Sequence, residues 1–168
     1  MISVDAKTGS GADWAAIAVV IFGVTAFSIS QGLTYPLVSL VLAARGVAPG
    51  VIGLNGASFA AGMALSVILV GPISRNIRGN RLIVLSLLGA ALSLALFAGF
   101  DALWIWFAAR FGLGFCASLI FMISEAWLNT ACPDHIRGRV TGLYGASLCA
   151  GFAAGPLAIP VFGTADGS

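Results

Sequence analysis

An arginine and a glutamate share the polar face of one apolar segment, and together they could bind or move a charged solute. Arg110, Gly114, Ser118, Phe121 and Glu125 fall within about 80° of one another at about 100° per helical residue. Arg110 lies roughly 12 Å from the nearer end of the segment 102–128, at about 1.5 Å per residue. In a bilayer, an arginine at that depth costs at least ~2.5 kcal/mol unless it faces a cavity or a partner. We interpret Arg110 as a cation that binds an anionic group or tunes a proton carrier. The alternative is a side chain that snorkels to the outer interface.

The composition indicates that this segment crosses a membrane. The chain of 168 residues is 60% hydrophobic and 8% charged, whereas soluble domains carry roughly 25% charged residues. Each hydrophobic span reaches or passes the ~20 residues that cross ~30 Å of hydrocarbon. The five predicted spans lie at 14–42, 51–73, 82–100, 102–128 and 140–162. The sequence therefore predicts an all-α, multi-pass protein whose surroundings are a lipid bilayer.

Positively charged residues predict the orientation of the spans. Arg45 stands alone on one side, whereas six Lys and Arg residues lie on the other: Lys7, Arg75, Arg78, Arg81, Arg137 and Arg139. This bias puts the N-terminus in the cytoplasm, with the protein in a plasma membrane, the inner membrane in a bacterium. Trp14 and Trp127 are expected near the inner interface, and Trp104 and Trp106 near the outer one. The net charge of +2 lies on the predicted cytoplasmic loops, so it indicates topology and no nucleic-acid partner.

Glu125 lies near the cytoplasmic end of its span, on the side of the five arginines. The interpretation we favour is a salt-bridge partner that holds an inner gate shut, with Arg75, Arg78, Arg81, Arg137 or Arg139 opposite. Two alternatives stay open. The carboxylate could be a proton site with its pKa raised by desolvation, or it could simply be solvated at the helix end.

Further polar residues could line the same pathway. Ser28, Gln31 and Tyr35 recur at i, i+3 and i+7 on the first span, and Asn55 lies on the second. They could hydrogen-bond a solute, or they could bond neighbouring helices instead. His135 is expected to be a loop residue. No nucleophile–base pair, metal-ligand cluster or phosphate-binding loop is visible, so we expect neither an enzyme nor a cofactor or metal site.

One twelve-residue segment of the sequence occurs a second time in a similar form. Gly53–Ala64 recurs as Gly142–Ala153, with eight identical positions at an offset of 89. Three turns of the chain separate the copies, so the second would enter the bilayer from the opposite side. Secondary transporters use such inverted repeats, although Gly/Ala-rich helices can also match by chance. Small residues every four positions around Gly62, and at Gly151 and Gly155 before Pro156, predict close helix packing.

The offset also predicts a missing helix. The third span begins near Leu82, so its counterpart would begin near position 171, beyond Ser168. We therefore expect residues 1–168 to form an incomplete N-terminal helical domain that lacks its sixth helix. The missing C-terminal half, or a second membrane chain, would then be a partner.

Several ordered segments resemble motifs of the N-terminal half of a major facilitator superfamily (MFS) transporter. Gly71–Arg81 stands where that family has its motif A, and Arg110–Gly114 is similar to motif B. Arg137–Arg139 with Gly151–Pro156 resembles motif C, which is associated with antiporters. The acidic residue of motif A is replaced at about Arg75, and the closing glycines of motif C by Ile159-Pro160. The resemblance implies a 3+3 inverted-repeat half.

These observations favour one function over another. The first is secondary active transport of a small solute by alternating access, coupled to an ion or proton, with this chain as the N-terminal part. The alternative is a non-transporting membrane scaffold or regulatory protein that keeps the half-fold. Buried Arg110 and the helix breaks that we expect at the prolines favour the first.

Overall fold

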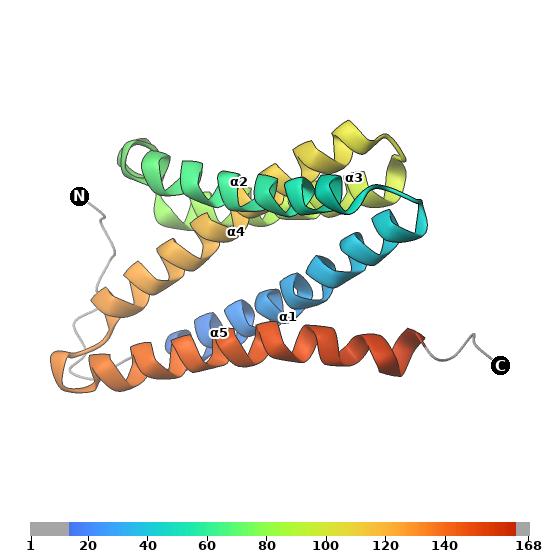
Figure 1. The fold of residues 1–168 in the computed structure, drawn as a ribbon. Helices are drawn as coiled ribbons and strands as arrows, with labels where there is room; N and C mark the ends of the chain where they lie inside the picture. The colour runs from blue at the N-terminus through green and yellow to red at the C-terminus, as the bar shows by residue number, and fades with distance from the viewer. Residues whose placement is uncertain (1–13, 164–168) are drawn as a thin grey trace. The chain divides into compact units, whose positions relative to one another are not determined.

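The computed structural model describes residues 14–163, with side chains up to residue 157, as five helices (Figure 1). They are α1 (Trp14–Ala44), α2 (Pro49–Asn76), α3 (Gly79–Gly99), α4 (Leu103–Ala131) and α5 (Asp134–Gly163). All five are long and apolar enough to cross a membrane. Even α3, the shortest, has 21 residues, which matches the ~20 needed. The predicted all-α fold with five spans is confirmed.

Some predictions fall outside the described residues. Lys7 belongs to the N-terminal segment 1–13, and the residues after Gly163 form the other end. The side chains of Ile159 and Pro160, which replace the closing glycines of motif C, also lie outside the described part.

The end of α1 follows from one glycine. Gly46 has a φ of 75°, a left-handed conformation that glycine adopts at little cost. The Gly46 N–H bonds the Ala43 carbonyl at 2.9 Å, and the Val47 N–H bonds that of Leu42 at 3.1 Å. This pair of bonds is a Schellman motif, which satisfies carbonyls at the end of a helix. Pro49 then begins α2, where its missing N–H costs nothing.

Helix α5 begins earlier than the sequence predicted. Its first residue is Asp134, whereas the hydrophobic span was expected to start at 140. The Pro133 carbonyl accepts from the N–H groups of Ile136 and Arg137, each at 3.1 Å. The Asp134 carboxylate is stabilised by the positive end of the helix dipole. His135 is therefore helical, and its expected place in a loop was wrong.

The prolines do not interrupt the helices. α1 continues through Pro36 and α5 through Pro156, each as one α-helix. Near Pro36, the hydroxyls of Thr34 and Ser39 bond the carbonyls of Ser30 and Tyr35 at 2.6 and 3.2 Å. Neither of these is the Gly32 carbonyl, which loses its i+4 donor at Pro36, so these bonds add to α1 without replacing the missing one.

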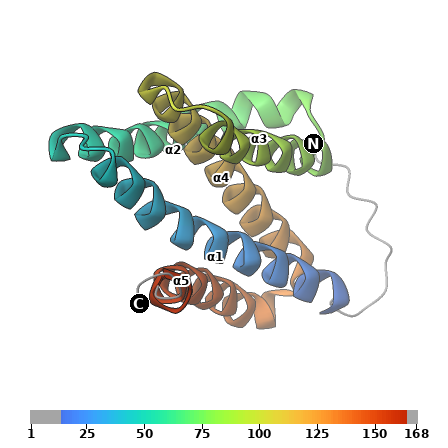
Figure 2. The same cartoon turned by 90° about the vertical axis from the view of Figure 1, so that its right-hand side faces the viewer.

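The described residues form two compact units. The first contains residues 48–123, which include α2, α3 and most of α4. The second contains 14–47 and the residues from 124 onward, with α1 and α5 side by side in both views (Figure 2). Helix α4 contributes residues to each unit.

In the first unit, α2 and α4 touch backbone to backbone. A Cβ placed on Gly62 would lie 2.9 Å from the Phe115 nitrogen and would overlap the Phe111 carbonyl oxygen. A Cβ on Gly114 would overlap the Phe59 carbonyl oxygen and lie 3.1 Å from the Phe59 Cα. Only glycine permits this approach at the two positions, as the predicted small-residue packing requires.

In the second unit, α1 and α5 touch in the same way. A Cβ on Gly151 would lie 2.8 Å from the Ser28 Cβ and 2.9 Å from the Thr25 carbonyl oxygen. A Cβ on Gly155 would lie 2.8 Å from the Gly32 Cα, and one on Gly32 would lie 2.5 Å from the Phe152 carbonyl oxygen. Gly151 and Gly155 therefore lie in direct contact with α1, as expected for residues that pack helices closely.

The two crossings use matching registers. Gly62 and Gly151 are 89 residues apart, as in the sequence repeat. Gly62 meets the carbonyl of Phe111 and the nitrogen of Phe115, whereas Gly151 meets the carbonyl of Thr25 and the nitrogen of Ile29. The Thr25 and Ile29 contacts lie 86 residues before those at Phe111 and Phe115. This differs by three residues from the 89 of the repeat, so the pairing of the two helices differs between the crossings by about one turn. The repeated sequence thus corresponds to a repeated mode of helix packing.

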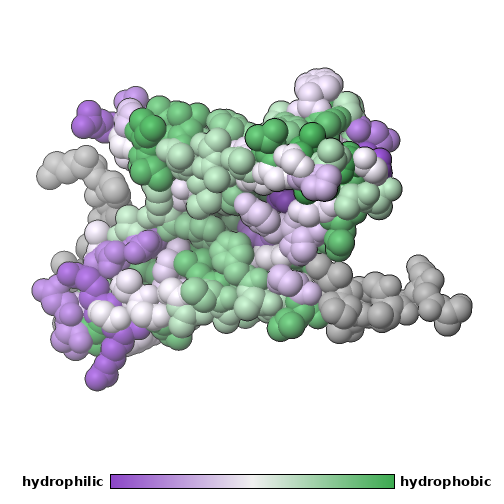
Figure 3. All heavy atoms as spheres, in the orientation of Figure 1, coloured by the Kyte–Doolittle hydropathy of each residue, from purple (hydrophilic) through white to green (hydrophobic). Residues whose placement is uncertain are grey.

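The surface of each unit suits lipid. Large apolar side chains are exposed along the helices, such as Phe22 at 79%, Ile68 at 72% and Leu88 at 63%. Figure 3 shows much apolar surface along the helices of each unit and hydrophilic groups at several helix ends. Buried polar side chains such as Arg110 and Asn55 are therefore the starting point for a candidate site.

The α2–α4 crossing gives a stability prediction. Gly62→Ala should lower the free energy of unfolding by about 1–3 kcal/mol, because the added methyl meets backbone that no rotamer change can move. Gly56→Ala, on the same helix with nothing within 4 Å, should be neutral or stabilising by up to ~1 kcal/mol. Thermal unfolding in detergent micelles measures both. Equal effects at the two positions would contradict the crossing.

Candidate functional site

Arg110 lies inside the protein. It belongs to the part of α4 within the first unit, and only 1% of it is exposed. Its helix presents a buried face that also includes Leu113, Gly114 and Ala117. A side chain this buried does not snorkel to headgroups, so the structure favours the interior position that the sequence suggested.

The Arg110 side chain bonds an amide on α2. Its Nε donates to the Asn55 Oδ1 at 3.3 Å, and Asn55 is 1% exposed. The contact is with the second predicted span. Among the described residues no group bonds the Asn55 Nδ2. A buried donor without an acceptor costs about 1–3 kcal/mol, so this atom calls for an explanation.

Two aromatic side chains lie near Arg110. Its guanidinium carbon lies 5.9 Å from the centroid of the Phe97 ring, a cation–π arrangement. The Phe97 and Trp106 rings meet edge to face at 5.4 Å and 90°. The Trp106 Nε1 donates to the Phe100 carbonyl at 2.7 Å, which ties the indole to the end of α3. Sequence reasoning missed Phe97.

Trp106 corrects one prediction. The sequence suggested that Trp104 and Trp106 both lie in an outer aromatic belt. Trp104 is 73% exposed, as a belt residue should be, but Trp106 is only 4% exposed and packs on Phe97. Two residues apart on a helix, the two indoles point about 200° apart at about 100° per residue, so only one can face the lipid.

Short connections and the glycine crossing assemble this cluster. Only residues 100–102 separate α3 from α4, so the end of α3 that carries Phe97 lies beside the start of α4 that carries Trp106 and Arg110. Asn55 is brought to α4 by the crossing at Gly62 and Gly114. The Ser58 hydroxyl, one turn from Asn55, lies 3.4 Å from the Phe107 carbonyl and adds a polar contact between α2 and α4.

The rest of the predicted polar face of α4 divides in two. Ser118 is buried with Gly114, and its hydroxyl lies 3.6 Å from the Met122 sulfur. Phe121 is half-buried, and Glu125 is exposed and belongs to the second unit. There the Glu125 carboxylate interacts electrostatically with Tyr144, a phenol that is 3% exposed. Sequence reasoning did not single out Tyr144, although it replaces Asn55 in the second copy of the repeat.

The predicted polar residues of α1 lie in the second unit with different environments. Ser28 is buried, and its hydroxyl bonds the Val24 carbonyl of its own helix at 2.8 Å. Gln31 is 2% exposed, and among the described residues its Oε1 has no donor. Tyr35 is half-buried. The Gln31 Oε1 therefore has hydrogen-bonding capacity that a solute could use.

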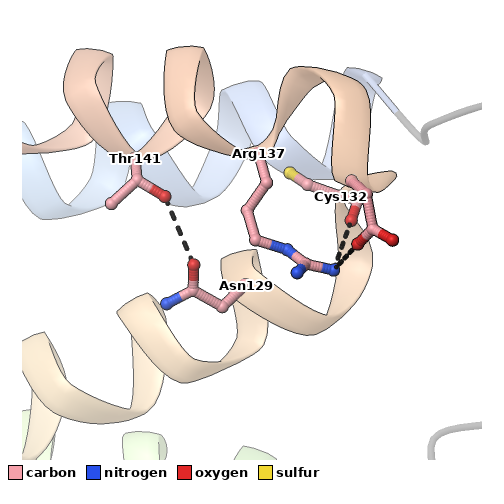
Figure 4. Close-up of polar contacts among 5 residues, drawn as sticks. Asn129, Cys132, Arg137 and Thr141 are labelled. Atoms are coloured by element: carbon pink, nitrogen blue, oxygen red, sulfur yellow. Dashed lines mark hydrogen bonds and ion pairs between the residues drawn. The ribbon is translucent and has the colours of Figure 1, made fainter.

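The predicted gate arginines are all exposed near helix ends. Arg75 ends α2, Arg78 and Arg81 flank the start of α3, and Arg137 and Arg139 lie in the first turns of α5. The Arg137 Nη2 lies 2.6 Å from the Asp134 Oδ1 and also donates to the Cys132 carbonyl at 3.4 Å (Figure 4). The carboxylate that Arg137 contacts in the structure is that of Asp134, one helical turn away, and its pairing with Glu125 stays a prediction.

Beside this ion pair, α4 and α5 are joined by a side-chain bond. The Thr141 hydroxyl donates to the Asn129 Oδ1 at 3.3 Å (Figure 4). The Arg137–Asp134 pair is exposed on both sides and contributes no more than about 1 kcal/mol. The neutral bond between the two helices is thus at least as relevant to this turn as the charges.

The fold and the buried cation define a multi-pass membrane protein with an arginine in its interior. The sequence matches the family model of the Major Facilitator Superfamily over residues 12–167. The chain belongs to that family of transporters.

Two curated relatives have a similar sequence. The chain is 29% identical over 156 residues to the uncharacterized MFS-type transporter YfkF of Bacillus subtilis (strain 168), a match that covers 86% of the chain. It is 30% identical over 105 residues, 62% of the chain, to the enterobactin exporter EntS of Escherichia coli O1:K1 / APEC. These matches span 37% of YfkF and 25% of EntS. No solved structure matches the chain significantly.

The aromatic cluster gives a prediction with a control two residues away. Trp106→Phe should lower the free energy of unfolding by about 0.5–1.5 kcal/mol, because the Phe100 carbonyl loses its donor. Trp104→Phe, at an exposed position, should change it by less than about 0.5 kcal/mol. Thermal unfolding in the same detergent compares the two. A larger effect at Trp104 would show that the cluster does not hold α3 on α4.

Proposed function

We propose that this chain is the N-terminal part of a secondary active transporter, which moves a small solute by alternating access with ion or proton coupling. The observation that carries the proposal is the burial of Arg110 at 1% exposure between an amide and an aromatic ring. Ionisable residues inside membrane helices are expensive and mark substrate or ion pathways. A chain that only had to pack helices would place a small apolar residue there.

Two further buried atoms support a pathway. The Gln31 Oε1 and the Asn55 Nδ2 have no partner among the described residues. Membrane interiors offer no water to satisfy such groups, so they are retained where a solute or a water-filled cavity reaches them. Each lies on the helix where the sequence predicted pathway residues.

The relatives support a direction and a location. EntS is named an exporter, and Gly151, Gly155 and Pro156 resemble the antiporter motif. We therefore assign outward movement across a bacterial inner membrane, with the N-terminus in the cytoplasm. In this arrangement the exposed arginines at the ends of α2, α3 and α5 face the cytoplasm. Glu125 is their candidate partner in an inner gate, and as a proton site it would couple transport to pH.

Arg110 can be tested in the full-length protein. Arg110→Ala should reduce export of enterobactin, the first solute to try, by at least about tenfold, since it removes a charged hydrogen-bonding group. Membrane insertion should be unchanged. Arg45→Ala removes the same charge from an exposed turn and should export normally. Flux from vesicles, normalised to inserted protein, measures both. Equal export by the two variants would contradict the proposed role, and no export by any form would favour a scaffold.

Glu125 separates gating from proton coupling. If it closes the inner gate, Glu125→Gln should increase maleimide labelling of cysteines placed in the cytoplasmic vestibule, because the loss of a charged pair favours the inward-open state. Asp134→Asn removes a carboxylate that already pairs with Arg137 and should leave labelling unchanged. Unchanged labelling of Glu125→Gln with an altered pH dependence of flux would make Glu125 a proton carrier and rule out the gate.

A further inference from the structure

The orientation of the Asn55 amide is fixed by Arg110. A guanidinium only donates hydrogen bonds, so the amide oxygen must be the atom that faces it. The observed bond from the Arg110 Nε to the Asn55 Oδ1 at 3.3 Å has this arrangement. The Asn55 Nδ2 is then the remaining polar atom of the amide. It is buried, and no described group accepts from it.

We propose that Asn55 selects the transported solute: its Nδ2 donates to an oxygen of an organic acid whose carboxylate also binds Arg110. The proposal rests on the transport function above and names its substrate class. The Asn55 Nδ2 and the Arg110 guanidinium both offer only N–H donors on adjacent side chains. A carboxylate has two acceptor oxygens and the opposite charge, so it can take both donors. An amine would place donor against donor and cation against cation.

The aromatic neighbours suggest the rest of the solute. Phe97 lies against the guanidinium, and its ring meets that of Trp106 edge to face. An acid with an aromatic or other apolar body would keep this region free of water, which strengthens the charge-assisted hydrogen bonds. The assignment is therefore an organic anion with an apolar body, and a strongly hydrated inorganic anion fits less well.

A structural role alone does not explain Asn55. Other buried polar residues in the same unit satisfy themselves within their helices: Ser66 bonds the Met63 carbonyl at 2.7 Å, and Ser93 bonds that of Gly89 at 2.9 Å. Asn55 instead uses one half of its amide on Arg110 and leaves the other half unused.

The other unit shows that the crossing does not need this pair. The offset of 89 residues between α2 and α5 matches Asn55 with Tyr144, and the offset of 86 between α1 and α4 matches Arg110 with Val24. Tyr144 and Val24 are both buried. The flanking Gly-Leu and Gly-Ala-Ser residues are the same in both copies. The packing is thus repeated without the amide and the cation, so these two residues serve something other than packing.

The experiment is a binding measurement on the purified full-length protein in detergent. Benzoate is the probe, and benzylamine, with the same ring and a cationic donor group, is its matched opposite. Wild-type protein should bind benzoate at least about tenfold more tightly than benzylamine, measured by thermal shift at constant ionic strength. Benzylamine binding as tight as that of benzoate, or no benzoate binding, would overturn the proposal.

Two variants at Asn55 test the residue itself. Asn55→Asp keeps an acceptor for Arg110 but replaces the donor by a negative charge, and Asn55→Leu removes the amide without adding a charge. Both should weaken benzoate binding at least about tenfold. Ser66→Ala, a buried change on the same helix that removes only an intrahelical bond, should stay within about twofold of wild type. The use of two unlike variants keeps the test decisive if one of them misfolds. Wild-type affinity in either folded variant would overturn the role of Asn55.

The proposed acid site and the proposed transport function can be disproved independently of each other. Asn55-dependent benzoate binding in a protein that moves no solute would leave the acid site and overturn the transporter. Intact export by Asn55→Leu and Asn55→Asp, together with Arg110-dependent flux, would overturn the acid site and leave the transporter.

Discussion

Backbone contact between α2 and α4 is the constraint on which the candidate site depends. Gly62 and Gly114 let the two helices approach until each glycine meets a carbonyl of the other helix. Lipid offers no hydrophobic drive for helices to associate, so van der Waals contact at small residues must hold them. At this separation the short Asn55 side chain reaches Arg110. A wider crossing would leave the guanidinium without its amide, and the buried charge would then be harder to retain.

The cluster around Arg110 is held from three helices by unlike interactions. Asn55 on α2 orients the guanidinium by a hydrogen bond, and Phe97 on α3 lies under it. Trp106 meets the Phe97 ring edge to face and bonds the Phe100 carbonyl. The two hydrogen bonds are strongly directional, and the ring contacts are less so. The aromatic contacts mainly keep water out, which raises the strength of any electrostatic interaction inside. The arrangement orients a positive charge before a solute arrives.

Much of this organisation could be predicted from the sequence, because the bilayer imposes simple requirements. Span lengths, all-α structure and the importance of Arg110 follow from the thickness of hydrocarbon and the cost of a buried cation. The ion pair between Arg137 and Asp134 could also have been predicted, because Asp134 stands three residues before Arg137, a spacing at which side chains meet on a helix. The hydrophobic span began later than α5 because hydropathy does not detect its polar first turn.

The partners of Arg110 could not be predicted, because they depend on which residues of two other helices meet α4. A shift of α2 by one residue would turn Asn55 by about 100° away from the guanidinium, and nothing in the sequence fixes that register as finely as the glycine contacts do. The two units differ at the matched positions of the repeat. The same crossing carries Tyr144 and Val24 in one unit and Asn55 and Arg110 in the other. The two units thus share a similar glycine crossing, and they differ in whether it carries a buried charge and an amide that orients it.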